Sequence, residues 1–240
     1  MKVDFHTHTA DDPLDRIPHS TLQLIDRAAA MGYGALAITL HERQLDLASV
    51  AAYAADRRLV LIPGIEQSIE GKHVLLINFR RGAEEVKTFS ALAALKAREP
   101  GLVVAPHAFF PAPTCLRGLL GRHADLFDAV EYNAMFTRSL NFNRRALAWA
   151  RANGKPVVGN GDVHRLRQLG TTWSEVDAPA DADAICAAVA AGRVECHATP
   201  LSWPDAAGIM MNLAWPTLAG PRIETTPASG STNISLTQSA

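Results

Sequence analysis

The sequence is poor in cysteine, and this absence excludes two classes of protein. Its 240 residues include only three cysteines, Cys115, Cys186 and Cys196. Their odd number and wide spacing form neither a disulfide framework nor a C-x-x-C metal pair. We therefore expect reduced thiols, as in a cytosolic protein.

Long apolar runs are missing too. No apolar stretch reaches the ~18 residues that a membrane-spanning helix needs. The opening residues, MKVDFHTHT, lack the apolar core of a secretory signal. The sequence predicts a cytoplasmic protein without a membrane partner.

Neither positive nor negative charge is in excess, since the formal net charge is −1, and no basic run exceeds three residues. Tight binding of long nucleic acid would need several contacts from Lys or Arg to phosphate, so that class of partner is disfavoured. A small anionic substrate remains compatible, because bound metal ions add local positive charge. With 48% hydrophobic and 20% charged residues, the composition is that of an ordinary globular protein.

Short β-type runs alternate along the chain with Ala- and Leu-rich segments of helical period. Pro63 and Gly64 are expected to end the third run, and the turn at 70–72 suits a hairpin into the fourth. The expected strands are 3–5, 35–40, 59–62, 74–79, 102–105, 127–132 and 156–159, and the expected helices are 22–31, 45–55, 83–97, 139–152 and 180–191. This alternation predicts an α/β fold with a largely parallel sheet, and about seven units in ~200 residues favour a small barrel. We expect one domain over 1–224 and a polar, flexible tail over 225–240.

Nine histidines occur, and most of them fall near the ends of these strands together with carboxylates. The two pairs spaced by two residues are His6 with His8 and Asp162 with His164, and the single residues are His41, Glu66, His73 and His107. Because the carboxyl ends of barrel strands converge on one rim, residues distant in sequence are expected to meet there.

A pocket of imidazoles and carboxylates without a basic cluster is electrostatically unfavourable unless cations bind in it. Divalent metals meet that need, and a mixed nitrogen and oxygen ligand set suits Zn, Mn or Fe. A single buried histidine is more often a hydrogen-bonded core residue, and H-x-H alone is a weak motif. The joint placement of all these residues favours a metal cluster.

Several segments resemble the PHP (polymerase and histidinol phosphatase) superfamily in order and spacing. They are FHTHT, ALAIT-x-H, PGIE, the following His73, APH, VEYN, GNGDVH and RVECHATPLSW, which together cover residues 1 to about 203. The resemblance implies a distorted (β/α)7 barrel, two or three divalent metal ions (Mn, Fe or Zn) at the carboxyl rim of the strands, and hydrolysis of phosphate esters.

The same resemblance implies a ligand for each position. The first metal would take His6, His8, Glu66 and Asp162, the second Glu66, His73 and His107, and the third His41, His164 and one residue among Asp11, Asp12, Asp15 and His19. Of these four we favour Asp12. Two departures from the family pattern, Thr39-Leu40-His41 in place of T-D-H and Ala10–Pro13 in place of S-D-G, both concern the third position.

Glu66, Asp162 and His164 are the expected catalytic residues, with Glu66 bridging the pair of metals that activates water. Arg138, Arg144 and Arg165 are candidate phosphate contacts, although each also fits a solvated surface arginine. Glu131 and Asn133 are expected to support the ligands or contact substrate. Phe109 and Phe110 would line a leaving-group pocket or pack in the core.

The predicted function is metal-dependent hydrolysis of a small phosphomonoester by a metal-activated water. The sequence does not indicate an oligomeric state. A phosphodiesterase or exonuclease that trims short oligonucleotides is the enzymatic alternative, and a non-catalytic metal-binding domain is the alternative from another class. An amidohydrolase is less favoured, because no lysine lies at a strand end where it would bridge metals.

Overall fold

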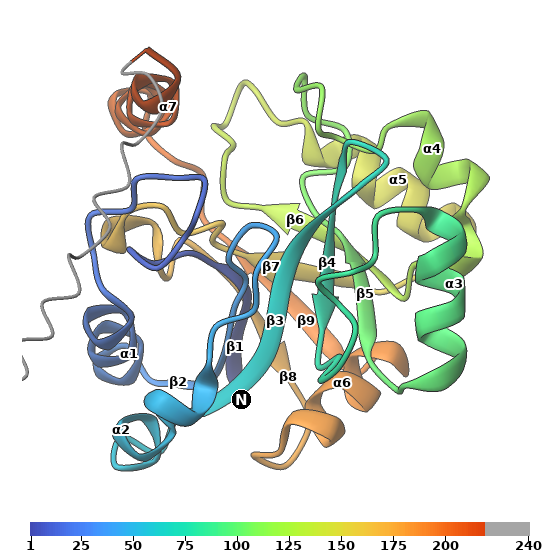
Figure 1. The fold of residues 1–240 in the computed structure, drawn as a ribbon. Coiled ribbons are helices and arrows are strands. Elements are labelled where there is room, and N and C mark those ends of the chain that lie inside the picture. The colour runs from blue at the N-terminus through green and yellow to red at the C-terminus, as the bar shows by residue number, and fades with distance from the viewer. Residues whose placement is uncertain (219–240) are drawn as a thin grey trace, which may run out of the picture.

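The protein has a mixed α/β fold in which helices surround a curved sheet (Figure 1). A computed structural model describes residues 1–218, so the predicted tail 225–240 and the end of the predicted domain lie outside the described residues. The strands are β1 (Lys2–Thr7), β2 (Tyr33–Ile38), β3 (Val60–Ile69), β4 (Lys72–Ile77), β5 (Leu102–Ala105), β6 (Ala129–Asn133), β7 (Val157–Asn160), β8 (Thr172–Val176) and β9 (Val194–Ala198). The helices are α1 (Thr21–Ala30), α2 (Ala51–Ala55), α3 (Phe89–Arg98), α4 (Gly118–Arg122), α5 (Asn143–Asn153), α6 (Ala182–Ala190) and α7 (Trp203–Leu218).

Within the described residues the strands form one sheet in the order β7-β6-β5-β4-β3-β2-β1-β8-β9. β1, β2 and β3 are mutually parallel neighbours, as are β5, β6 and β7, whereas β4 runs antiparallel to both β3 and β5. β8 is antiparallel to β1 and β9. The α/β class and a barrel-like sheet are confirmed. The count of seven β/α units stays a prediction. β3 and β4 are joined by a turn without a helix, so this pair of strands does not follow the regular β/α alternation.

The sheet curves until β7 lies against β8 and β1. Gly159 N donates to Ser174 Oγ (3.0 Å), and this hydroxyl donates back to the Gly159 carbonyl (3.0 Å). Phe5 N on β1 donates to Asn160 Oδ1 on β7 (3.0 Å). These contacts nearly close the barrel between its first and last parallel strands.

Replacement of Gly159 by alanine is expected to destabilise the fold. An added Cβ would lie 2.5 Å from the Trp173 carbonyl oxygen and 2.9 Å from Cys196 Sγ, and the first of these is backbone that cannot move aside. Overpacking of this kind costs about 1–3 kcal/mol of the free energy of unfolding. Urea denaturation would measure it, with Gly121→Ala as the matched control, because a Cβ at Gly121 meets no atom within 4 Å. Equal stability of the two variants would contradict this account of the closure.

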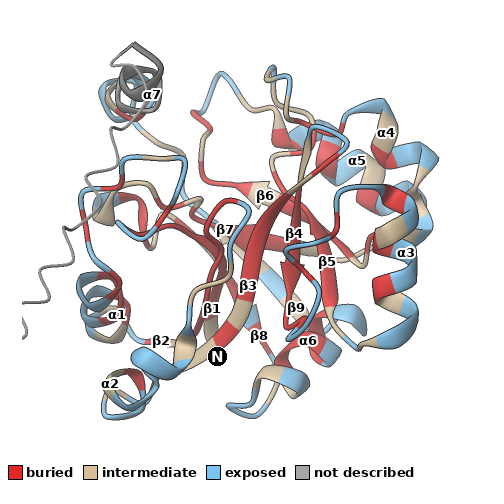
Figure 2. Ribbon diagram, in the orientation of Figure 1, coloured by how far each residue is buried: buried red, intermediate tan, exposed pale blue. Residues whose placement is uncertain are grey.

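Three apolar clusters hold the layers together. One contains residues from each of β1 to β7 and is completed by Ile185, Ala188 and Val189 of α6, so it fills the barrel interior. The second packs α3, α4 and α5 on one outer side, and the third packs α1 and α2 on the other. Figure 2 shows β1 to β7 mostly buried and the helices exposed along their outer faces, whereas β9 contains no buried residue.

Several predicted helices were too long, and in α3 a polar capping residue sets the start. Thr88 accepts a hydrogen bond from Ala91 N, so α3 starts at Phe89 and not at residue 83. The predicted helix 45–55 is a short 3₁₀ turn, Leu47–Ser49, followed by α2. The predicted helix 139–152 begins at Asn143. Among the described residues, no helix has the length and hydropathy that a membrane span requires.

The expected end of the third strand at Pro63-Gly64 was wrong. β3 continues to Ile69, because it changes partner at this point: it pairs with β2 as far as Pro63 and with β4 from Gly64 onwards. The predicted turn and antiparallel hairpin before the fourth strand are confirmed. Glu66 therefore lies inside a strand, where its position relative to both neighbouring strands is fixed.

Candidate metal centre

The predicted histidines and carboxylates gather at the end of the barrel opposite α6, where the parallel strands have their carboxyl ends. His6 lies in β1 and Glu66 in β3, while His8, His41, His107, Asp162 and His164 lie in the loops that follow β1, β2, β5 and β7. His73 is near the start of β4. Because β4 is antiparallel, its beginning lies at the same rim, so His73, near the start of its strand, joins residues that lie near or beyond the ends of theirs.

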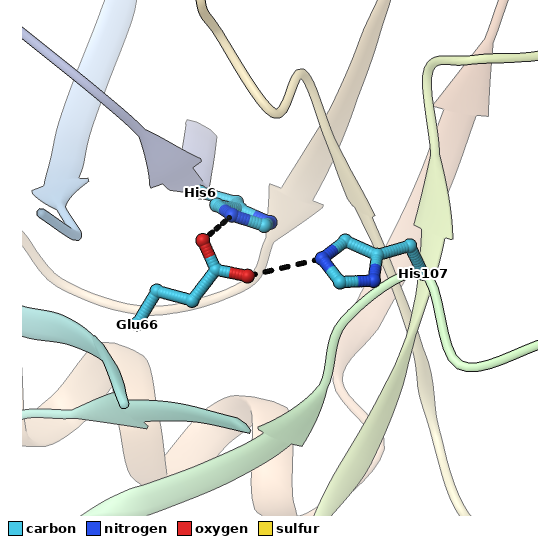
Figure 3. Close-up of side chains that lie close together, drawn as sticks. All are labelled: His6, Glu66 and His107. Carbon is cyan, nitrogen blue, oxygen red and sulfur yellow. Dashed lines mark hydrogen bonds and ion pairs between the residues drawn. The ribbon is translucent and has the colours of Figure 1, made fainter. Parts of the chain in front are cut away.

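Glu66 is the centre of the cluster, and its side chain is 2% exposed. Its Oε2 atom lies 3.1 Å from His6 Nε2, 3.4 Å from His8 Nε2 and 3.2 Å from His41 Nε2. Its Oε1 atom lies 2.6 Å from His73 Nδ1 and 3.0 Å from His107 Nε2. Figure 3 shows this carboxylate between the His6 and His107 rings, one oxygen directed at each. One buried carboxylate thus faces five imidazoles.

Asp162 provides a second carboxylate on the other side of His6 and His8. Its Oδ1 atom lies 3.4 Å from His6 Nε2, 3.6 Å from His8 Nε2 and 3.4 Å from His164 Nδ1. Asp162 and His107 have φ angles of 47° and 29°, in the left-handed region that residues other than glycine rarely adopt. Such conformations concentrate at functional sites, where surrounding contacts hold the backbone in place.

Glu131 in β6 is a buried carboxylate behind the cluster and accepts four hydrogen bonds. Oε1 accepts from His6 Nδ1 (2.8 Å) and Asn160 Nδ2 (3.0 Å). Oε2 accepts from His107 N (2.6 Å) and Asn133 Nδ2 (3.0 Å). This arrangement holds His6 with Nδ1 turned away from the centre and Nε2 turned toward it. It fits the supporting role expected for Glu131, and Asn133 links it to Asp162 Oδ2 (3.0 Å).

The donor set fits a divalent metal ion. His8 Nδ1 pairs with Asp12, while the buried His8 Nε2, which faces the cluster, has no hydrogen-bond partner. Three groups of potential ligands have their atoms within 4.8 Å of one another: His6, Glu66 and His107; His6, His8 and Asp162; and His8, His41 and Glu66. Neutral imidazole and carboxylate together suit Zn, Mn or Fe. An unpaired, buried nitrogen is costly unless a ligand satisfies it.

Electrostatics bind the rings and carboxylates to each other. Burial by itself raises the pKa of Glu66, but the charges of His73, His6 and His41 outweigh it and hold that pKa well below its ordinary value. Burial lowers the pKa of His6, whereas Asp162, Glu66 and Glu131 raise it to well above the ordinary value of histidine. Protonated His6 and the carboxylates around it thus stabilise one another's charged forms.

A family model described as PHP-associated matches residues 141–194, from just before α5 to the first residue of β9. The match covers less than a quarter of the chain, and it shows that this segment is similar to PHP-associated sequences. No curated protein matches the chain significantly by sequence.

Solved structures support the PHP fold. A Bacteroides vulgatus two-domain protein containing a predicted PHP-like metal-dependent phosphoesterase is 17% identical with a TM-score of 0.64, over 83% of this chain and 65% of that one. This chain therefore spans slightly less than two thirds of that protein. PsfC from Pseudomonas syringae is 19% identical with a TM-score of 0.61, over 91% and 98% of the chains. The lesion-specific endonuclease PfuEndoQ from Pyrococcus furiosus is 14% identical with a TM-score of 0.53, over 87% and 66%.

The structure places the four residues considered for the third metal position differently, and the favoured Asp12 stays a prediction as a ligand. Asp12 is fully buried, and its Oδ2 atom accepts from His8 Nδ1 (2.9 Å), His41 N and His41 Nδ1 (both 3.0 Å). Its Oδ1 atom accepts from Leu14 N and Asp15 N (both 2.9 Å), so both oxygens are occupied.

Asp15, in contrast, is directed at the cluster of histidines and carboxylates. Its Oδ2 atom lies 3.0 Å from His164 Nε2 and 4.0 Å from His41 Nδ1, and its side chain is 32% exposed. The other two candidates are directed elsewhere: His19 Nε2 donates to the His8 carbonyl, and Asp11 accepts from Thr9 and Thr21. The sequence left four residues open because the conformation of the loop at 9–19 sets this choice.

The cluster lines a cavity of about 590 Å³. Asp15, His41, Glu66, His73, His107, Asp162 and His164 all border it. The candidate phosphate contacts Arg138, Arg144 and Arg165 do not, and within residues 1–218 no lysine or arginine does. Arg138 borders a neighbouring depression and Arg144 is exposed on α5. Within residues 1–218, the side chains bordering this site that can carry positive charge are therefore histidines.

Sequence reasoning missed Asp4, which lies fully buried beneath the cluster of histidines and carboxylates. It accepts from His6 N (3.0 Å) and Gly161 N (3.0 Å), and burial raises its pKa to about 8. A carboxylate in the middle of a strand of apolar neighbours was the available signal. Asp4 joins the backbone beside His6 to the loop that carries Asp162.

Metal binding to the cluster is expected to release protons near pH 7. Burial lowers the pKa of His8, but its hydrogen bond to Asp12 and the nearby Asp162 and Glu66 raise it well above the ordinary value, and the pKa of His107 is raised as well. Because metal binds only the neutral ring, affinity should fall as pH drops below these raised values. Calorimetric titration with Zn²⁺ or Mn²⁺ in two buffers of different ionisation enthalpy would count the protons. An identical heat in both buffers would contradict the prediction.

Proposed function

We propose that this protein is a metal-dependent phosphoesterase that hydrolyses a small phosphomonoester. The observation that carries the proposal is the Glu66 carboxylate surrounded by five imidazoles in a cavity at the barrel rim. The fold shared with a protein containing a predicted PHP-like metal-dependent phosphoesterase supports the same reaction class.

Two or three divalent ions would be held by the residues at the rim. His6, His8, Glu66 and Asp162 would hold one, Glu66 with His73 and His107 a second, and His41 and His164 with Asp15 a third. When bound, such ions neutralise phosphoryl charge and lower the pKa of water enough for hydroxide to form near neutral pH.

The protein's own residues orient the ligands and shape the site. Glu131 and Asp12 accept hydrogen bonds from Nδ1 of His6, His8 and His41, which leaves the Nε2 atom of each ring facing the centre. Glu66 and Asp162 supply the negative charge that favours cations there. Asp15 and His164 are accessible from the cavity, where a phosphoryl group would enter.

A phosphodiesterase or nuclease is the second candidate, because PfuEndoQ shares the fold. Another structure similar to this chain is a complex of Endonuclease Q with a 27-mer duplex substrate. Against it, no lysine or arginine of residues 1–218 lines the cavity, and the net charge is −1. Binding of a duplex relies on several such contacts to phosphate.

Metal analysis combined with a substrate panel tests the proposal. The protein would be reconstituted with Mn²⁺, Fe²⁺ or Zn²⁺, its bound metal quantified, and turnover of phosphomonoesters compared with that of dinucleotides. We expect two or three ions per chain, hydrolysis of monoesters, and loss of activity on chelation that metal restores. Faster cleavage of dinucleotides would favour the second candidate, and full occupancy without any hydrolysis would indicate a non-catalytic metal-binding domain.

A further inference from the structure

We propose that the substrate of this site carries an aromatic or similarly bulky apolar leaving group without further charge. This inference rests on the proposed phosphoesterase function and adds the class of ester. It is drawn from the part of the cavity that the metal-type cluster does not occupy. That part is lined mainly by large apolar side chains, namely Phe110, Phe136, Leu140, Phe142, Trp203 and Met210, which we call the apolar wall.

The apolar wall is built from three separate segments that converge on one cavity. Phe110 lies in the loop that follows His107, and Phe136, Leu140 and Phe142 lie in the segment between β6 and α5. Trp203 and Met210 lie on α7, which Figure 1 shows apart from the helices that cover the barrel. The Phe110 and Phe142 rings are in contact, with centroids 5.3 Å apart and planes at 51°. The loop after β5 thus joins a metal-ligating position directly to the apolar wall.

Exposure shows that the apolar wall is not simply part of the core. Trp203 is 58% exposed, Met210 56% and Leu140 45%, and none of them belongs to the three core clusters. Single exposed apolar residues are ordinary, but several that converge on one concave surface indicate a ligand site. A volume of about 590 Å³ lies in the range of small-molecule pockets.

Charge determines which leaving groups fit. The charged side chains that border the cavity are those of the cluster itself, and within residues 1–218 no lysine or arginine borders it. Arg138 borders the adjoining depression, which shares Thr137 and Trp203 with the cavity. A leaving group with a second phosphate or a carboxylate would find no cation inside the cavity itself. One rich in hydroxyls would lose hydrogen bonds to water, because the wall offers few polar partners beyond Thr114 and Thr137. An apolar ring instead gains by leaving water.

The orientation of the ester follows from this division of the cavity. The phosphoryl group lies at the cluster, and the ester oxygen points toward Phe110 and Phe142. Water attacks phosphorus and the bond from phosphorus to the ester oxygen breaks. One proton of that water ends on the ester oxygen, so an uncharged alcohol or phenol leaves along the apolar wall. Inorganic phosphate remains at the cluster.

Two alkyl esters test the inference. The metal-loaded protein would be given 3-phenylpropyl phosphate and glycerol phosphate. Glycerol is the more acidic alcohol and the better leaving group, so reactivity alone would favour glycerol phosphate. Since a single methylene in an apolar pocket changes kcat/KM by ~10–200-fold, we expect the phenyl ester to be preferred by at least about 10-fold. Binding of non-hydrolysable 3-phenylpropylphosphonate and methylphosphonate, measured by calorimetry, should show the same order.

Variants of exposed residues locate the effect. Trp203→Gln should reduce the preference for the phenyl compound by at least about 5-fold in both assays, and it is expected to fold because Trp203 is exposed. Leu147→Gln is the matched control, since Leu147 is 37% exposed on α5 and does not border the cavity. It should leave the preference unchanged.

The outcomes separate the two proposals. Hydrolysis of both esters with equal efficiency, or a preference for glycerol phosphate, would overturn the apolar leaving group and leave the phosphoesterase intact. If no ester is hydrolysed, the proposed function fails, and the phosphonates still decide the inference: tighter binding of the phenyl compound upholds the apolar wall, and equal binding rejects it.

Discussion

Glu66→Gln is expected to remove bound metal and phosphoesterase activity together. The carboxylate lies within 3.4 Å of nitrogen atoms from five histidines, and no other group among the described residues faces as many. An amide keeps the size of the side chain but loses its charge and one acceptor, so it cannot serve two metals at once. We expect a loss of metal affinity and of kcat/KM well above the ~10–100-fold that removal of a supporting residue causes.

Metal content and kcat/KM would both be measured, because the proposal requires that they fall in parallel. Glu85→Gln is the matched control, since Glu85 is exposed and does not border the cavity. Full metal content with normal activity in Glu66→Gln would reject the central role of Glu66. Full metal content with lost activity would show that Glu66 contributes to the reaction but is not needed as a ligand.

Glu131→Gln should weaken metal binding although Glu131 is not itself one of the proposed metal ligands. All four partners of Glu131 are donors: His6 Nδ1, His107 N and the side-chain amides of Asn133 and Asn160. Glutamine has one acceptor oxygen, so its NH₂ group must face two of these donors. We expect metal affinity to fall by ~10–100-fold and the free energy of unfolding of the metal-free protein to fall by about 1–3 kcal/mol.

The two readouts distinguish positioning from a purely structural role. If Glu131 only stabilised the fold, the variant would unfold more readily in urea yet bind metal with normal affinity at low temperature. Because Glu131 holds His6 and the backbone of His107, we expect the loss of affinity even under conditions where the variant is fully folded. The Glu85→Gln protein should match the unmodified protein in both measurements.

The sequence allowed the site to be located because ligand positions at a barrel rim follow from strand ends. His6, His8, His41, His107 and His164 each lie where a predicted strand ends or just beyond it, and the structure brings them together. Pairing of β3 with two different neighbours was not visible in the pattern, so Glu66 was expected after a strand instead of inside one. The pattern of apolar residues records burial, but it does not record which strand lies next to which.

The loops were beyond the reach of the sequence for a different reason. The choice between Asp12 and Asp15 depends on the backbone of residues 9–19, where hydrogen bonds from Leu14 and Asp15 turn Asp12 inward. The apolar wall brings Trp203 of α7 to the same cavity as Phe136, which lies more than 60 positions earlier, a separation that no local period encodes. Phe109 and Phe110 illustrate the limit: Phe109 packs against the core, and Phe110 borders the cavity.

The order of strands in the sheet has a consequence for synthesis. β1 leaves the ribosome long before β8, which is one of its two neighbours, and Asp162 and His164 come only shortly before β8. Until β8 has been synthesised, β1 therefore has an open edge able to pair with other chains. The metal centre is complete only after the barrel is nearly whole, so metal then stabilises the finished fold by mass action and cannot template its early stages.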